Sequence, residues 1–226
     1  MRHPAAAHVF VDDVDAPALN ADDAHHLARV LRLRSGEEVT VADGRGGWRL
    51  CAYADGPHLE PIDDVERVAP PSVPVTVAFA LTKGDKPELA VQKLTELGVD
   101  RIVPITAARS VVQWDDAKAA RNVERLRAVA RAAAMQSRRA FLPVVEGIAT
   151  LASLAGDGVA VAHASGDRLD ESITTIAVGP EGGWTDEELG VISRHIDLGP
   201  TTLRAETAAV AAGVLLTAVR DGRVCL

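Results

Sequence analysis

Cysteine and long apolar runs are scarce in this 226-residue sequence, and both shortages exclude classes of protein. The two cysteines, Cys51 and Cys225, are too few for a disulfide framework, so a reducing cytoplasm is the simplest compartment. We expect a buried thiol at Cys51 and a terminal one at Cys225. Although 47% of the residues are apolar, no uncharged run is long enough to span a membrane. Acidic residues also follow the N-terminus too early for a signal peptide, which predicts a cytoplasmic protein.

Positive charge is also in deficit, because 24 basic residues face 32 acidic ones and leave a net charge of −8. Over the whole chain this balance argues against nucleic-acid binding, which draws on clusters of Lys and Arg. The basic residues are concentrated in two zones, however: residues 25–34, and residues 118–139, where seven stand against the single acid Glu124. The second zone could be an ordinary solvated helix face, but such a face usually mixes both signs of charge. An acidic protein with two such zones can bind RNA locally.

Three prolines within residues 70–74 interrupt both helix and sheet patterns, and we expect a domain boundary there. Residues 1–70 contain a helix pattern near 21–31 and strand patterns at 37–44 and 47–54. Residues 71–226 alternate apolar strands with helices, which predicts a parallel α/β domain. The expected strands are 75–81, 101–106, 159–163, 175–179 and 196–199, and the expected helices are 87–99, 118–137, 186–195 and 206–219.

The glycine-rich stretch "GPEGG" (residues 179–183) lacks lysine, arginine and any phosphate-binding motif. It precedes a helix whose start is marked by a capping box, Thr185 with Glu188. Its glycines permit a ligand to approach the backbone closely, but a polyphosphate would require the lysine and hydroxyl of a P-loop. The dinucleotide fingerprint is missing too. The stretch therefore indicates either a site for a ligand that is neutral or cationic where it meets the chain, or only a tight strand-to-helix turn.

A second segment, "LGPTTLRAETAAVAAG" (residues 198–213), delivers Arg204 and Glu206 beside the start of an apolar helix. Glu206 is favourably placed against the dipole of that helix and could be a cap, with Arg204 only its ion-pair partner. Two loops at the ends of neighbouring parallel strands can also form one crevice, however, and ligands of α/β proteins bind in such crevices.

Several stretches together resemble one known family. They are "VGPEGGWTDEEL", "LGPTTLRAETA", "LTKGDKPELAVQKLTELGVDRIVPITAARSVV", "AAAMQSRRAFLPVV" and "HHLARVLRLRSGEEVTVADG". All are similar to segments of the RsmE family of 16S ribosomal RNA uridine-N3 methyltransferases, members of the SPOUT superfamily, and the resemblance covers essentially the whole chain. It implies an α/β fold with a trefoil-knotted, parallel-sheet methyltransferase domain over residues 71–226, preceded by a small PUA-like RNA-binding β-barrel over residues 1–70.

The resemblance further implies S-adenosylmethionine as cofactor, 16S ribosomal RNA or the small ribosomal subunit as partner, and a homodimer formed through the last helix. The residues implied to bind the cofactor are His163, Gly179, Pro180, Glu181, Gly182, Gly183, Leu198, Gly199, Leu203 and Arg204. Two positions depart from the family pattern. Thr201 stands where a basic residue is common, and Met135 stands where an acid commonly precedes the glutamine.

Arg204 and Glu206 are the predicted catalytic residues. Arg204 would stabilise negative charge on a uracil carbonyl oxygen, while Glu206 or Glu181 would orient it or accept a proton. The arginines predicted to contact RNA phosphates are Arg29, Arg32, Arg109, Arg131, Arg138 and Arg139. His25 and His26 have no partner at metal-ligand spacing, so we expect no metal site. Trp48 and Tyr53 could stack on RNA, but their strand setting favours core positions.

Two other classes of protein fit parts of the pattern. One is a non-catalytic RNA-binding protein whose C-terminal domain only dimerises, and the intact segments at 179–183 and 203–204 argue against it. The other is a small-molecule α/β enzyme that uses a nucleotide, and the missing phosphate motifs argue against that.

Overall fold

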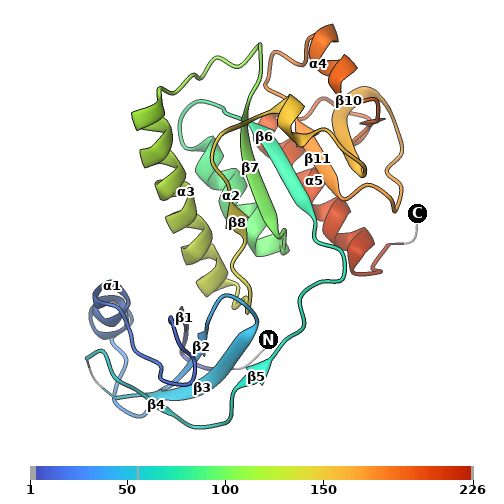
Figure 1. Ribbon diagram of the computed structural model, residues 1–226. Helices are drawn as coiled ribbons and strands as arrows, with labels where there is room; N and C mark the ends of the chain where they lie inside the picture. Colours follow the sequence, from blue (N-terminus) through green and yellow to red (C-terminus); the bar gives the residue numbers. More distant parts are fainter. Residues whose placement is uncertain (1–3, 55, 225–226) are drawn as a thin grey trace. The chain divides into compact units, whose positions relative to one another are not determined.

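A computed structural model describes residues 4–54 and 56–224, and the chain divides into two compact units (Figure 1). The first unit comprises the described residues up to Pro71 together with Ala134–Leu142, and the second comprises Ser72–Ala133 and the chain from Pro143 onward. Cys225, for which a terminal thiol is expected, lies outside the described residues. None of the helices in these two stretches is both long and apolar enough to cross a membrane.

The first unit is built on a five-stranded sheet in the order β1-β2-β3-β4, with β5 paired to β3. Its strands are β1 (Ala7–Phe10), β2 (Glu38–Ala42), β3 (Gly47–Tyr53), β4 (Leu59–Pro61) and β5 (Glu66–Arg67). The hairpin of β2 and β3 matches the two predicted strands, whereas β1, which pairs in parallel with β2, was not predicted. The predicted helix begins as α1 (Ala21–His25) and continues as the π-helix η1 (His26–Leu31).

The core of the first unit contains the side chains that the strand pattern predicted to be buried. Tyr53 is 1% exposed and Cys51 is fully buried, and burial raises the pKa of the Cys51 thiol to about 11. Trp48 is half-buried and packs beside Phe10. These positions confirm the core interpretation for Tyr53 and the buried thiol for Cys51.

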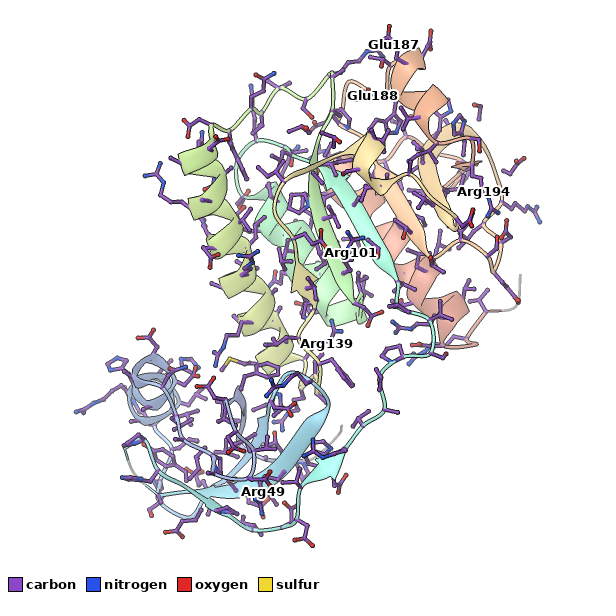
Figure 2. All side chains as sticks on the ribbon, viewed as in Figure 1. Arg49, Arg101, Arg139, Glu187, Glu188 and Arg194 are labelled. Carbon is purple, nitrogen blue, oxygen red and sulfur yellow. The ribbon has the colours of Figure 1, made fainter. Side chains whose placement is uncertain are left out.

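Buried His8 on β1 ties the later segment 134–142 to the sheet of the first unit. Burial lowers the pKa of His8 to about 4, so the ring is neutral at pH 7. The ring lies 3.0 Å from the carbonyl oxygen of Arg139, to which Nε2 donates, and Nδ1 lies 2.9 Å from the hydroxyl of Thr40. Arg139 is labelled in Figure 2.

The second unit contains a seven-stranded sheet in the order β12-β10-β11-β6-β7-β8, with β9 paired to β7, and every strand pair is parallel. Its strands are β6 (Thr76–Ala80), β7 (Arg101–Thr106), β8 (Val144–Val145), β9 (Ala149–Thr150), β10 (Val159–Asp167), β11 (Thr175–Val178) and β12 (His195–Ile196). Its helices are α2 (Lys86–Leu97), α3 (Asp116–Gln136, whose residues from Ala134 onward belong to the first unit), the 3-10 helix η2 (Leu151–Leu154), α4 (Asp186–Val191) and α5 (Ala205–Arg220).

These elements confirm the parallel α/β class, while the trefoil knot stays a prediction. Three boundaries differ most from the sequence prediction: β10 continues to Asp167, β12 covers only His195–Ile196 of the strand expected over 196–199, and one helix is shorter. The helix expected over 186–195 ends at Val191, because His195 pairs with Val161 as part of β12.

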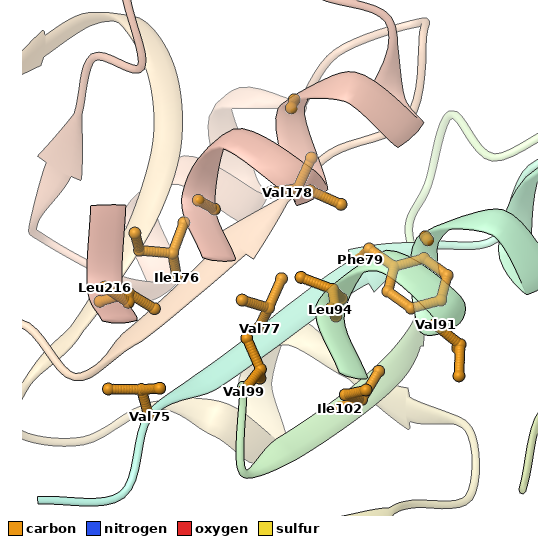
Figure 3. Packing of buried hydrophobic residues seen from close by; sticks show 14 of the residues in the cluster. Val75, Val77, Phe79, Val91, Leu94, Val99, Ile102, Ile176, Val178 and Leu216 are labelled. Carbon is orange, nitrogen blue, oxygen red and sulfur yellow. The ribbon is translucent and has the colours of Figure 1, made fainter. Parts of the chain in front are cut away.

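The two faces of this sheet are covered by different helices, as the alternation of strand side chains requires. Val77 and Phe79 of β6 pack in one cluster with Leu94 of α2 and Leu216 of α5 (Figure 3). Ala78 and Ala80 point to the opposite face, which η2 and α4 cover. Helices α2 and α5 run side by side in parallel, because Lys86 meets Glu206 at their N-terminal ends and Arg220 donates to the carbonyl of Gly98 at their C-terminal ends. Both helices therefore begin at the carboxyl edge of the sheet.

Candidate functional site

A cavity of about 390 Å³ lies beside the middle of β10 and at the carboxyl ends of its neighbours β11 and β12. Its walls are residues 162–164 of β10 and the two loops that follow β11 and β12, which meet because both of these strands pair with β10. The lining consists of residues 162–164, residues 178–184 except Gly182, residues 197–203, Ala205 and Ala208. Its position is the usual ligand crevice of an open parallel sheet.

Eight of the ten residues predicted to bind a cofactor line this cavity: His163, Gly179, Pro180, Glu181, Gly183, Leu198, Gly199 and Leu203. The other two, Gly182 and Arg204, are not part of the lining. A side chain at Gly182 would point toward Arg109, with its Cβ 3.1 Å from that of the arginine. Arg204 is exposed at the N-cap of α5, next in sequence to the lining residue Leu203. The tertiary structure thus brings both predicted loops to one cavity and turns two of their residues away from it.

Trp184 is a lining residue that sequence reasoning missed. Its ring is buried, and Nε1 donates to the carbonyl of Ala162 on β10 at 3.2 Å. The backbone of Gly179 lies against the ring, so that a Cβ there would come within 2.8 Å of Trp184 Cε2. The available signal was a hydrophobic staple, since Trp184 precedes the N-cap Thr185 and packs in one cluster with Leu189, four residues into the helix. Gly179 is therefore required by the close packing of this ring.

The glycine loop is also held from outside the cavity. The predicted capping box is confirmed: Thr185 Oγ1 accepts from the Glu188 amide at 3.2 Å, and Glu188 Oε2 accepts from the Thr185 amide at 2.9 Å. Glu188, labelled in Figure 2, also accepts from the amide of Ala108 at 2.7 Å. Arg109, which is predicted to contact RNA, donates to the carbonyls of Gly182 and Trp184 at 3.2 and 2.9 Å.

The cavity is electrostatically suited to a neutral or cationic ligand. Two carboxylates, Glu181 and Asp197, line it together with His163, and no lysine or arginine of the described residues does so. Asp197 accepts from the amide of Gly199 at 2.9 Å, which fixes its orientation. The hydrogen bond from Lys86 holds the pKa of Glu181 below its usual value, so that this carboxylate stays charged.

Lys86, the first residue of α2, is a second residue that sequence reasoning missed. Its Nζ lies 2.9 Å from Glu181 Oε1 and 3.5 Å from Glu206 Oε2. The signal was present in "LTKGDKPEL", which places lysines directly after the first strand of the α/β unit. The ion-pair partner of Glu206 is thus Lys86. Arg204, which the sequence allowed in that role, makes no ion pair with any residue that the structure describes.

The predicted RNA-contacting arginines fall into different environments. Arg29 and Arg32 are exposed at η1, and Arg32 terminates it in the left-handed conformation (φ 56°). Arg131 is half-buried, and Arg138 donates to the carbonyl of Ala5 in the first unit.

The basic side of α3 is partly neutralised by Glu124 of the same helix and by Glu88 of α2, and only the second of these contacts is hidden from the helix pattern. Arg125 lies 3.0 Å from Glu88 of α2, and Arg127 pairs with Glu124 and donates to the carbonyl of Val145. In the described stretches no group of three or more His, Cys, Asp or Glu residues could hold a metal ion.

Comparison with known families gives matches in both units. Residues 69–217 match the RNA methyltransferase domain family, and residues 19–58 match the RNA methyltransferase PUA domain family. A protein of Mycobacterium tuberculosis named ribosomal RNA small subunit methyltransferase E is 36% identical over 220 residues, covering 86% of this chain and 83% of the relative. A protein of the same name from Bacillus subtilis is 29% identical, with 88% of each chain covered.

Solved structures show the same fold. A methyltransferase from Legionella pneumophila, solved in complex with S-adenosylmethionine, is 26% identical and superposes with a TM-score of 0.82 over 93% of this chain and 96% of that one. A ribosomal RNA small subunit methyltransferase E from Neisseria gonorrhoeae also has a TM-score of 0.82 over 93% and 96% of the two chains. At 23% identity, this second likeness carries the fold alone.

Proposed function

The chain belongs to the ribosomal RNA small subunit methyltransferase E family of RNA methyltransferases, and on this premise we propose that it transfers a methyl group from S-adenosylmethionine to N3 of a uridine in 16S ribosomal RNA. The observation that carries the proposal is the cavity beside β10 and the carboxyl ends of β11 and β12, which is lined by two carboxylates and by no lysine or arginine of the described residues. When bound there, S-adenosylmethionine supplies a methyl group on a positively charged sulfur and brings no phosphate. Carboxylate walls and close backbone approach at Gly179 and Gly199 fit such a molecule.

Arg204 is the proposed electrophilic residue. Uracil N3 carries a proton at neutral pH, so a rapid transfer requires that the base be held in line and the proton removed. The guanidinium of Arg204 is exposed beside the cavity wall and has no ion-pair partner among the described residues. Its donors are therefore available to a carbonyl oxygen of the base, where negative charge develops as the proton leaves.

Glu206 is the proposed proton acceptor or base-orienting residue. Its side chain is 13% exposed in the first turn of α5, and Oε2 is buried without a hydrogen-bond donor. Glu206 does not itself line the cavity, but it stands between the lining residues Ala205 and Ala208, and its carboxylate would accept an N–H from a base turned into the site. Glu181 has less capacity to do so, because Lys86 already donates to it.

We propose that the domain over residues 1–70 binds RNA and that the domain over residues 71–226 transfers the methyl group. Arg29 and Arg32, exposed in the first domain, would contact phosphates.

The proposed assembly is a homodimer formed through α5, on which the side chain of Val214 is 44% exposed. The proposed compartment is the cytoplasm, where ribosomal subunits assemble.

The proposal is tested by titration calorimetry with S-adenosylmethionine, ATP and NAD, followed by methyl transfer to small-subunit RNA. We expect saturable binding of S-adenosylmethionine alone, and N3-methyluridine in the nucleosides released from the treated RNA, detected by mass spectrometry. Binding of ATP or NAD in place of S-adenosylmethionine would indicate a nucleotide enzyme. Binding of RNA with no affinity for S-adenosylmethionine would indicate a non-catalytic RNA-binding protein.

A further inference from the structure

One ammonium group joins three elements around the cavity. Lys86 begins α2, Glu181 lies in the glycine loop after β11, and Glu206 lies in the first turn of α5. Lys86 Nζ is 2.9 Å from the first carboxylate and 3.5 Å from the second. Of the two, Glu181 lines the cavity and Glu206 is the more buried, at 13% exposure against 47%.

The position of Lys86 is not explained by the stability of its own helix. A cation in the first turn of a helix opposes the positive end of the helix dipole, and here two helix N-termini, those of α2 and α5, meet. The burial of Glu206 Oε2 without a hydrogen-bond donor is unfavourable as well, and the ammonium is its compensating charge. The lysine at the helix N-terminus and the buried oxygen of Glu206 are both explained if the ammonium group stabilises the charges of the two carboxylates.

We propose that Lys86 is a positioning residue of the methyl-transfer site, whose ammonium group holds Glu181 charged and oriented along the cavity wall and screens it from Glu206. The inference rests on the proposed function, since the ligand that Glu181 would meet is S-adenosylmethionine. The hydrogen bond to Lys86 accordingly lowers the pKa of Glu181, and the same bond raises the pKa of Lys86. The other charged or titratable groups around Glu181 are Lys83, Glu206 and the cavity residues His163 and Asp197.

Removal of the ammonium should make cofactor affinity depend on acid pH. Without Lys86, Glu181 and Glu206 are like charges in one partly buried site, and one carboxyl pKa rises. Protonation then removes a negative charge from the site of a cationic ligand. In the intact protein Glu181 loses its charge only at lower pH, because Lys86 favours the charged form of this carboxyl group.

The experiment compares Lys86→Met with Lys93→Met by titration calorimetry with S-adenosylmethionine at pH values from 8 to 5. Lys93 is the matched control, because it lies on the same helix and pairs with Glu96 at 2.8 Å without lining the cavity. Affinity is expressed as the ratio of variant to wild type at each pH, which cancels every pH effect that the two proteins share. For Lys86→Met we expect this ratio to fall by about twofold between pH 8 and pH 5, because a one-unit rise of a carboxyl pKa that starts below its usual value reaches its full tenfold effect only below pH 5. For Lys93→Met it should stay constant.

Two further variants separate charge from shape. Lys86→Arg keeps the charge and should keep the wild-type profile, and adding Glu206→Gln to Lys86→Met should restore a flat ratio because the like charge is gone. A constant ratio for Lys86→Met, whether lowered or not, overturns the role, because a merely structural lysine would weaken binding equally at every pH. If Lys86→Met does not fold, Lys86→Gln is measured in its place by the same criterion. Absence of S-adenosylmethionine binding by the wild type would instead overturn the proposed function.

Discussion

At the residue scale, the chemistry of the proposed site depends on side chains that differ in how firmly they are held. Trp184 and Asp197 are fixed by hydrogen bonds within the cavity wall. Arg204 is exposed and makes no ion pair with the described residues. We therefore expect its side chain to contribute little to the free energy of unfolding. A guanidinium without an ion pair to the described residues has its donors available for the proposed contact with a substrate.

Arg204→Lys should separate catalysis from stability. Lysine keeps the charge but loses the planar pair of donors, so we expect turnover to fall by roughly 10²–10³, the effect of losing one charge-stabilising donor. Thermal stability and S-adenosylmethionine affinity should stay near those of the wild type. The measurement is methyl transfer to RNA that bears the target uridine, and near-normal turnover would contradict the catalytic role.

Gly179→Ala should impair cofactor binding through Trp184. The added methyl group would lie 2.8 Å from Trp184 Cε2 and 2.9 Å from Nε1, so the buried ring must move and lose its bond to Ala162. We expect overpacking to destabilise the protein by about 1–3 kcal/mol and to weaken S-adenosylmethionine binding. Gly190→Ala is the control, since a Cβ at that helical position meets no atom within 4 Å and should be neutral or stabilising. Equal melting temperatures and affinities for the two variants would contradict this account.

His8 should make the first unit sensitive to acid. Its pKa is about 4 in the folded chain against 6.5 for the free side chain, so the unfolded state binds the proton first as pH falls. The free energy of unfolding is therefore unaffected by His8 above about pH 6.5 and falls as the pH is lowered toward 4. The loss between pH 7 and pH 5 is about 2 kcal/mol. In urea unfolding, His8→Gln should remove this part of the pH dependence, and His58→Gln, at an exposed position, should not. An unchanged pH dependence in His8→Gln would refute the assignment.

At the element scale, helix starts and strand ends define the site. The N-termini of α2 and α5 lie together at the carboxyl edge of the sheet, and the loops after β11 and β12 open there. In the first unit, η1 exposes Arg29 and Val30, and Arg32 is exposed at its C-cap, where the proposed RNA contact would lie. Arg109 and Arg138 also support the fold, because each donates a hydrogen bond to a backbone carbonyl, and their RNA contacts stay a prediction.

Removal of the η1 arginines should weaken RNA binding and its dependence on salt. If Arg29 and Arg32 each neutralise a phosphate, the double change to alanine should lower the slope of log affinity against log salt by roughly 1.4–1.8. Fluorescence anisotropy with small-subunit RNA at several salt concentrations measures this slope, and Arg223→Ala, at a 75% exposed side chain of the second unit, is the control. An unaltered slope would make η1 an ordinary solvated surface.

At the scale of the whole molecule, charge and apolar surface are unevenly distributed. The chain carries a net charge of −8, yet Arg29, Arg32 and Arg34 stand together and exposed in the first unit without an acid between them. In the second unit, one side of α5 packs on α2, where Gly213 meets Leu94, and Val214 next to it is exposed. Such an apolar helix side fits a second copy of the chain.

Val214→Glu should convert the proposed dimer into monomers. A buried, unpaired carboxylate at a helix interface is strongly unfavourable, whereas the same side chain on a free surface costs little. Sedimentation analysis should show the halved mass for Val214→Glu and the wild-type mass for Val111→Glu, whose position is 71% exposed in a loop. A monomeric wild type would refute the homodimer.

The sequence by itself determined the features that depend on local chemistry or on a distinctive string of residues. Apolar runs of strand length and the capping box at Thr185 predicted the parallel α/β class and the start of α4, because both signals act within a few residues. The "GPEGG" and "LRAET" strings indicated the family, and the missing phosphate motifs indicated a ligand without phosphate.

Only the tertiary structure decided which side chains meet across the sheet. Lys86 pairs with residues about a hundred positions away, Arg109 turns to the glycine loop, and β1 joins β2 from the far end of the first unit. No periodicity records such pairings, because they follow from the order of parallel strands and the packing of helices on them. For the same reason the sequence could name Arg204 and Glu206 together, and only the folded chain showed that Glu206 faces Lys86 while Arg204 has no ion-pair partner in the part described.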